Sequence, residues 1–135
     1  MGMPTHEDAK LIIQLFQLRL EPAMLEAERW FATDFRPGSW TEVDARYPTG
    51  SPERLLLARM LEYWEMVGAL IDHNLLNEDL LFDVLENTER LWGRLQGWLP
   101  AARAAGALKA GENIEILVNH QRRWQQLYIA KSERL

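Results

Sequence analysis

The stretch 51-SPERLLLARMLEYWEMVGALIDHN-74 decides the fold that we expect for this chain. Ser51 is a favoured helix N-cap, and Pro52 suits the first helical position because it has no N–H to satisfy. Apolar side chains then recur at intervals of three and four residues: Leu56, Met60, Tyr63, Trp64, Val67, Leu70 and Ile71. This spacing predicts an amphipathic helix over about 52–73 whose apolar face forms the centre of the core, with Trp64 buried.

The same segment carries signals for the end of the helix and for its closest neighbour. Asn74 tolerates the left-handed backbone conformation that ends many helices. Gly68 and Ala69 have little or no side chain, and the distance between packed helices depends on the side chains at their contact. We therefore expect that another helix can approach closely at Gly68-Ala69.

The rest of the chain is also predicted to form helices and turns. Gly and Pro fall between periodic segments, and no segment shows the sustained apolar–polar alternation of a half-buried strand. A helix over about 78–98, capped by Asn77, is predicted to run antiparallel to 52–73 because the link is short. A last helix from about Glu112 is predicted to bury five residues: Ile114, Leu117, Val118, Trp124 and Tyr128.

These elements predict an all-α fold. With 135 residues, the chain has the usual size of one domain with one hydrophobic core. We expect a compact single-domain bundle of about five or six helices over 1–135, with a central antiparallel hairpin of 52–73 and 78–98. The terminal segments 1–5 and 131–135 are expected to fray.

Composition excludes several classes of function. The chain has no cysteine, which rules out disulfides, thiolate metal sites and thiol enzymes. It has neither an export signal nor a long apolar run, so we expect a cytoplasmic protein without a membrane contact. Net charge is −5, and the segment Met60–Glu89 contains eight acidic residues and no Lys or Arg. A nucleic acid would be repelled by such a surface, so none is expected as a partner.

Two acidic pairs are the candidate metal site. Glu62-x-x-Glu65 and Glu86-x-x-Glu89 resemble the paired acidic motif of all-helical nucleoside-triphosphate pyrophosphohydrolases, with Glu89 where that family has Asp. Carboxylates at this spacing on facing helices can hold Mg or Mn for phosphate chemistry. At 100° per residue, however, Glu62 and Glu86 lie away from the apolar faces of their helices, which favours a solvated surface.

A second polar cluster flanks the predicted hairpin turn: Asp72, His73, Glu78, Asp79 and Asp83. A histidine among carboxylates can bind a cation or exchange protons. Each residue also has a local role, since acidic side chains stabilise a helix N-terminus and a histidine stabilises a C-terminus. We favour these local roles and expect no catalytic or cofactor-binding residue here.

The hairpin also resembles a known family. The motif Tyr63-Trp64-Glu65 is followed by Asp72-His73-x-Leu75-Leu76-Asn77-Glu78-Asp79-Leu80-x-Phe82-Asp83, and Ala9-Lys10-Leu11-Ile12-x-Gln14-Leu15 lies near the N-terminus. Together they resemble a family of small all-helical bacterial proteins catalogued only as a domain of unknown function, over most of residues 6–105. The resemblance implies a bacterial helical domain and supplies no catalytic residues.

The sequence favours a non-catalytic protein–protein interaction module, with a homodimer as one form of that contact. The chain has six tryptophans, more than folding requires, and the acidic segment 60–89 and those tryptophans that the core does not take up are the expected contact surfaces. The basic pair Arg122-Arg123 is expected to contact the acidic segment, within the chain or across a dimer. The alternative is a Mg- or Mn-dependent hydrolase of a phosphorylated small molecule that uses the four paired glutamates.

Overall fold

The computed structural model describes residues 2–107 and 109–133, and these form eight helices and no strand. The all-α prediction is confirmed, with more helices than expected. The helices are α1 (His6–Arg19), α2 (Pro22–Thr33), α3 (Trp40–Arg46), α4 (Pro52–Asp72), α5 (Glu78–Val84), α6 (Glu89–Gly93), α7 (Leu99–Ala104) and α8 (Glu112–Glu133).

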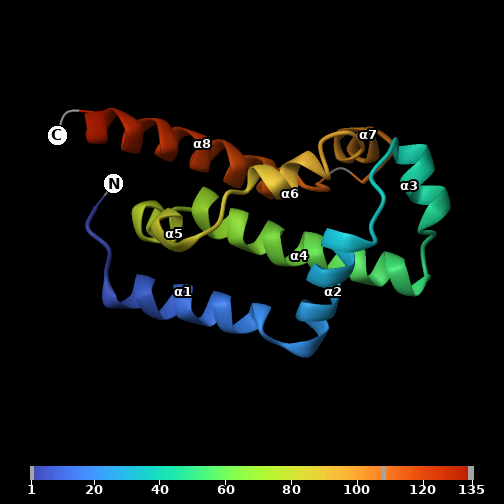
Figure 1. The fold of residues 1–135 in the computed structure, drawn as a ribbon, viewed down its shortest axis with the longest axis horizontal. Helices are drawn as coiled ribbons and strands as arrows, with labels where there is room; N and C mark the ends of the chain where they lie inside the picture. Colours follow the sequence, from blue (N-terminus) through green and yellow to red (C-terminus); the bar gives the residue numbers. More distant parts are fainter. Residues whose placement is uncertain (1, 108, 134–135) are drawn as a thin grey trace.

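Helix α4 is the centre of the molecule. It lies between α8 on one side and α1 and α2 on the other (Figure 1), and α8 and α2 are the helices that pack against it most extensively. Trp64 is 4% exposed in the middle of α4, as the periodicity predicts. One continuous hydrophobic cluster extends from Ile12 in α1 to Val118 in α8.

The predicted helix boundaries follow local signals. Four N-cap side chains each accept a hydrogen bond from a backbone N–H of the first turn: the predicted caps Ser51 and Asn77, and also Thr5 and Ser39. Asn74 has a φ of 56°, the left-handed conformation expected after α4. These caps need only a few neighbouring residues, so they could be identified from the sequence.

The predicted helix over 78–98 is wrong. Helix α5 ends at Val84, Leu85 is extended, and α6 begins at Glu89. Beyond Gly93 the chain turns again before α7. Because α5 packs against α8 and α1 rather than along α4, the central hairpin of 52–73 and 78–98 is not formed as predicted.

Gln121 of α8 explains the break between α5 and α6. Its side chain is 3% exposed, and its Oε1 accepts hydrogen bonds from the backbone N–H of Thr88 at 2.8 Å and from the Thr88 hydroxyl at 2.6 Å. Its Nε2 donates to the carbonyl of Glu86 at 3.0 Å. At the break, the backbone N–H of Thr88 and the carbonyl of Glu86 have lost their helical partners. The side-chain amide of Gln121, 33 residues from Thr88 in the sequence, binds both.

We expect Gln121→Leu to lower the free energy of unfolding by about 2 kcal/mol, since it leaves two donors of Thr88, the backbone N–H and the hydroxyl, and the carbonyl of Glu86 without partners. Urea unfolding followed by circular dichroism measures this change. Gln126→Leu, on an exposed position of the same helix, is the control and should change stability by no more than about 0.5 kcal/mol. Equal stability of the two variants would show that the hydrogen bonds of Gln121 do not stabilise the break between α5 and α6.

Gly68 is the point of closest approach between α4 and α8. A Cβ at this position would lie 2.1 Å from the carbonyl oxygen of Asn113, at the start of α8. In the same region, Glu65 Oε1 accepts a hydrogen bond from the backbone N–H of Ile114 at 2.9 Å. The predicted close approach at Gly68 is confirmed, and the partner helix is α8.

The terminal segments differ in their contacts. The carbonyl of Gly2 accepts a hydrogen bond from Asn77 Nδ2 at 2.9 Å, which ties residues near the N-terminus to the start of α5. Helix α8 continues to Glu133. Met1 and residues 134–135 lie outside the described residues, and the fraying of 1–5 and 131–135 stays a prediction. No helix in the described ranges is long and apolar enough to span a membrane.

Candidate binding groove

The four candidate metal ligands point to different partners. Glu62 is exposed on α4, whereas Glu65 lies against the first turn of α8. Glu86 forms an ion pair with Arg19 at 2.7 Å, and Glu89 binds Arg122 with Oε2 3.0 Å from Nη2. The structure does not bring these four carboxylates together.

Their electrostatics fit these separate roles. Burial raises the pKa of Glu65, although backbone N–H groups of α8 that bind the carboxylate act in the opposite direction. The hydrogen bond from Arg122 lowers the pKa of Glu89. Across the described part of the chain, no group of three or more His, Asp or Glu side chains is placed to hold a metal ion.

Two residues of the second polar cluster, Glu78 and Asp79, fix α8 on α5. Glu78 contacts His120 Nδ1, and Asp79 accepts a hydrogen bond from Trp124 Nε1 at 2.9 Å. Asp72 and His73 are exposed at the end of α4. The predicted contact between the basic pair and the acidic segment is made within the chain by Arg122.

Most tryptophans belong to the core. Four of the six are buried: Trp30, Trp64, Trp92 and Trp98. Trp40 and Trp124 are half-buried, and Trp40 stacks on Trp98 with ring centroids 6.0 Å apart. These four side chains are therefore not available as a contact surface, as was predicted for Trp64, and the contact role of the surplus tryptophans stays a prediction for Trp40 and Trp124.

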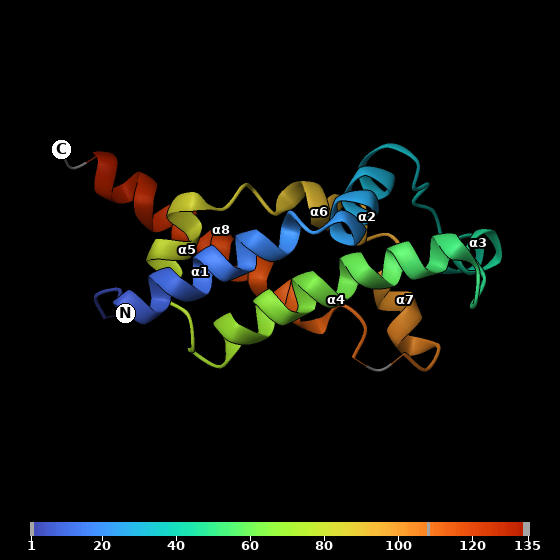
Figure 2. The ribbon, with the colours of Figure 1, turned by 90° about the horizontal axis from the view of Figure 1, so that it is seen from below.

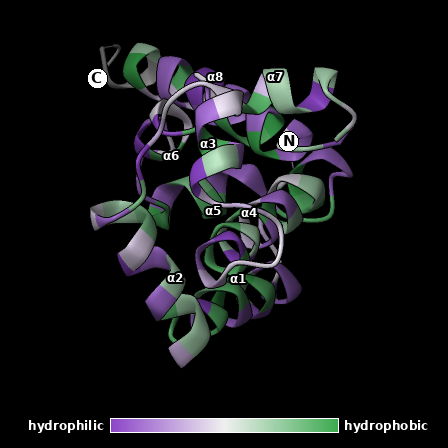
Figure 3. Ribbon diagram, turned by 90° about the vertical axis from the view of Figure 1, so that its right-hand side faces the viewer, coloured by the Kyte–Doolittle hydropathy of each residue, from purple (hydrophilic) through white to green (hydrophobic). Residues whose placement is uncertain are grey.

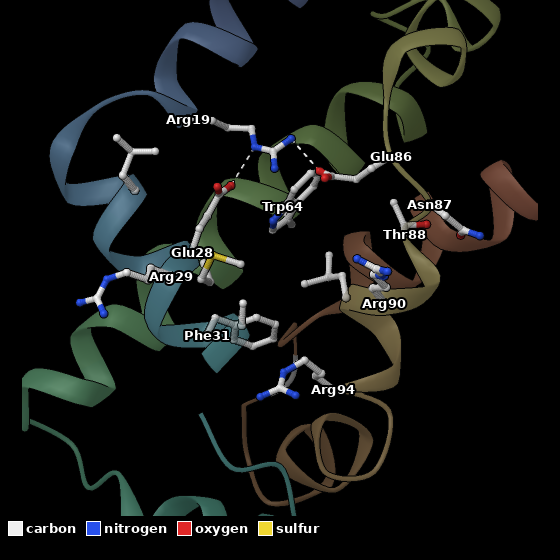
Figure 4. A pocket seen from close by; sticks show the side chains of 14 residues that line it. Arg19, Glu28, Arg29, Phe31, Trp64, Glu86, Asn87, Thr88, Arg90 and Arg94 are labelled. Carbon is white, nitrogen blue, oxygen red and sulfur yellow. Dashed lines mark hydrogen bonds and ion pairs between the residues drawn. The ribbon is translucent and has the colours of Figure 1, made fainter. Parts of the chain in front are cut away.

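The structure contains an open groove in which Glu86 is the one lining residue that the sequence analysis had named as a candidate site residue. It has a volume of about 1020 Å³ and lies between α2 and the 86–94 segment, with α4 beneath (Figure 4). Apolar side chains from three helices line it: Leu25, Phe31, Ala32, Met60, Trp64 and Leu91. The break between α5 and α6 contributes Glu86, Asn87 and Thr88 to one wall, so Gln121 also shapes the groove.

Arginines lie at both ends of the groove. At one end, the guanidinium of Arg19 lies between Glu28 and Glu86, 2.8 Å and 2.7 Å away, and 5.1 Å from the ring of Trp64 (Figure 4). Burial opposes the charge of Arg19, but the two glutamates outweigh it and raise the pKa of this arginine. Both glutamates of the groove are therefore engaged by one arginine.

At the other end, Arg94 lies 5.5 Å from the centre of the Phe31 ring and donates a hydrogen bond to the carbonyl of Phe35. Its Nε is buried and has no hydrogen-bond partner among the described residues. Contact with aromatic faces suits a planar guanidinium, which is less strongly hydrated than an ammonium group. The aromatic ring and the carbonyl hold Arg94 in one orientation.

Arg29 and Arg90 give the groove its excess of positive charge. They lie on α2 and α6, on opposite sides, and are exposed. Neither forms an ion pair or a side-chain hydrogen bond with any residue that the structure describes. The lining thus combines four arginines with two glutamates, in a chain whose net charge is −5.

Sequence reasoning missed this groove because its residues come from four helices, α1, α2, α4 and α6, and from the segments directly before and after α6. The arginines at 19, 29, 90 and 94 follow no short motif. The only signal in the sequence was the pair Arg90 and Arg94, four residues apart directly after a long acidic segment.

Fold and groove together define an all-helical protein with an open, partly apolar groove that is lined by four arginines. The chain belongs to the family described as "Domain of unknown function (DUF4760)", which matches residues 4–124. The resemblance to a domain of unknown function is thereby confirmed. No match was found among the curated proteins or the solved structures.

Proposed function

We propose that this protein is a non-catalytic interaction module that binds an acidic, amphipathic segment of another protein in the groove between α2 and α6. The observation that carries the proposal is that the groove is positively charged, whereas the chain as a whole is negatively charged. Arg29 and Arg90 have no acidic partner in the described chain, and they flank an apolar floor that includes Trp64 and Met60. Complementary charge guides association and fixes orientation, while apolar burial supplies most of the affinity.

The open shape of the groove favours a peptide segment over a small molecule. Ligand pockets enclose most of their ligand, whereas a helix that binds in a groove leaves its polar face in water. An amphipathic helix could place apolar residues over Phe31 and Leu91, with carboxylates near Arg29 and Arg90. We place this function in the bacterial cytoplasm, which a chain without cysteine suits.

Fluorescence anisotropy with a designed probe tests the proposal. The probe is a fluorescein-labelled helical peptide with Leu along one face and Glu along its flanks, and a second peptide carries Gln in place of Glu. We expect the Glu peptide to bind more tightly, and we expect the difference to shrink at high salt because exposed charges are screened. R29E/R90E should weaken binding of the Glu peptide by roughly tenfold.

The double variant R36E/K109E is the matched control. It makes the same change in net charge at two exposed positions that do not line the groove, and should change binding by less than about twofold. Equal loss of affinity in both variants would overturn the proposal, because net charge alone would then explain binding. Competition by phenyl phosphate as effective as by the Glu peptide would also overturn it, in favour of a small-anion site.

A further inference from the structure

The end of α8 projects from the bundle. Ile114, Leu117, Val118 and Gln121 of this helix are buried, but every residue from 126 to 130 is exposed. Both views show the last turns of α8 extending past α5 at one end of the molecule (Figures 1 and 2). The family match ends at residue 124, close to the point where α8 leaves the bundle.

This projecting segment is apolar on more than one side. Leu127 is 72% exposed, and Tyr128 and Ile129 are each 57% exposed. Hydrophobic residues are visible on these turns near the C-terminus in Figure 3. At 100° per residue, Tyr128 continues the line of Leu117 and Gln121, so the packing face of α8 extends past the last helix that covers it. This periodicity predicts that Tyr128 is buried, and the prediction is wrong for the single chain, in which Tyr128 is exposed.

Charge identifies the occupant of this face. The α8 segment 119–131 contains Arg122, Arg123 and Lys131 and no acidic residue, and the neighbouring α5 contains Glu78, Asp79 and Asp83 and no basic residue. Arg122, Glu78 and Asp79 already bind Glu89, His120 and Trp124 within the chain, so the exposed charges that face a second copy are those of Arg123 and Asp83. The two helices are adjacent, since Phe82 and Trp124 have ring centroids 6.0 Å apart. A basic apolar helix end beside an acidic helix is self-complementary, as a two-fold contact between identical chains requires.

We propose that two copies of this chain form a symmetric dimer through the projecting ends of α8. Each end lies against the α8 end and the acidic α5 of the other copy, which buries Leu127, Tyr128 and Ile129. The exposed Val84, at the end of α5, extends the apolar surface toward the partner. This dimer does not involve the groove between α2 and α6, so the two proposals stand independently.

Sedimentation velocity of the full chain over a range of concentrations tests the dimer. We expect a monomer–dimer equilibrium whose dissociation constant rises with salt. L127E/Y128E should raise that constant at least about tenfold, because it places acidic side chains in an apolar contact next to the acidic α5. The melting temperature should stay close to that of the wild type, since both side chains are exposed in the monomer.

L20E/L55E is the matched control, because it changes two exposed leucines outside this face by the same charge. It should leave the dissociation constant within about twofold of the wild type. A monomer at all concentrations would overturn the proposal, as would a dimer that both double variants weaken equally. R29E/R90E should dimerise normally, and L127E/Y128E should still bind the Glu peptide, so failure of either proposal is distinguishable from failure of the other.

Discussion

Trp64→Ala is expected to destabilise the protein by about 3–5 kcal/mol, a large part of the roughly 5–15 kcal/mol that stabilises a typical domain. Trp64 lies at the middle of α4, packs edge-on against Tyr63 with centroids 5.1 Å apart, and supports the guanidinium of Arg19. Truncation removes these contacts and leaves a cavity beneath the groove. Thermal melting followed by circular dichroism would detect an unfolded chain or a strongly lowered midpoint.

Glu62→Ala is the control on the same helix. Its side chain is exposed, so the substitution should change the free energy of unfolding by no more than about 0.5 kcal/mol. A Trp64→Ala protein that melts like the wild type would contradict the assignment of Trp64 to the core. If that variant also failed to bind the Glu peptide, Trp64 would be a contact residue of the groove and would not stabilise the fold.

The sequence predicted elements whose causes are local. The start of α4 depends on Ser51 and Pro52, and its buried face depends on a spacing that the sequence displays directly. The same holds for the caps at Thr5 and Ser39. For this reason the all-α class, the central helix and most helix starts follow from the amino-acid sequence alone.

The features that were missed depend on distant residues. The apolar spacing over 78–98 is helical throughout, yet the helix breaks because Gln121 satisfies the backbone at Glu86 and Thr88. Periodicity predicts that Tyr128 is buried, but its side chain is 57% exposed, since no helix among the described residues covers it. The apolar spacing within one segment carries no information about residues of other helices that contact it.

The groove could not be predicted from the sequence for the same reason: it depends on residues that are distant in the sequence. Its basic character depends on Arg19 engaging both Glu28 and Glu86, which leaves the other three arginines without an acidic partner in the lining. Counting charges along the chain gives the opposite expectation, because residues 60–89 are strongly acidic. The fold separates these charges: acidic residues fix α8 and Arg19, and the arginines of α2 and α6 face the groove.

The contact between α4 and α8 makes a further strong prediction, at Gly68. A Cβ there would lie 2.1 Å from the Asn113 carbonyl oxygen and 2.6 Å from its carbonyl carbon. Both atoms belong to the backbone, so no side-chain rotation relieves the overlap and the first turn of α8 must move. That movement also disturbs the hydrogen bond between Glu65 and Ile114. We expect Gly68→Ala to lower the free energy of unfolding by about 3 kcal/mol, the upper part of the usual range for overpacking.

Gly93→Ala separates this steric effect from the backbone effect of replacing glycine. Gly93 is also helical, but a Cβ there would meet no atom within 4 Å. Alanine favours helix by about 1 kcal/mol relative to glycine, so Gly93→Ala should leave stability unchanged or raise it. Urea unfolding of both variants measures the difference. If Gly68→Ala proved as stable as Gly93→Ala, α4 and α8 would have to lie farther apart than the structure places them, because a helix cannot accept a methyl group against a backbone carbonyl at that distance.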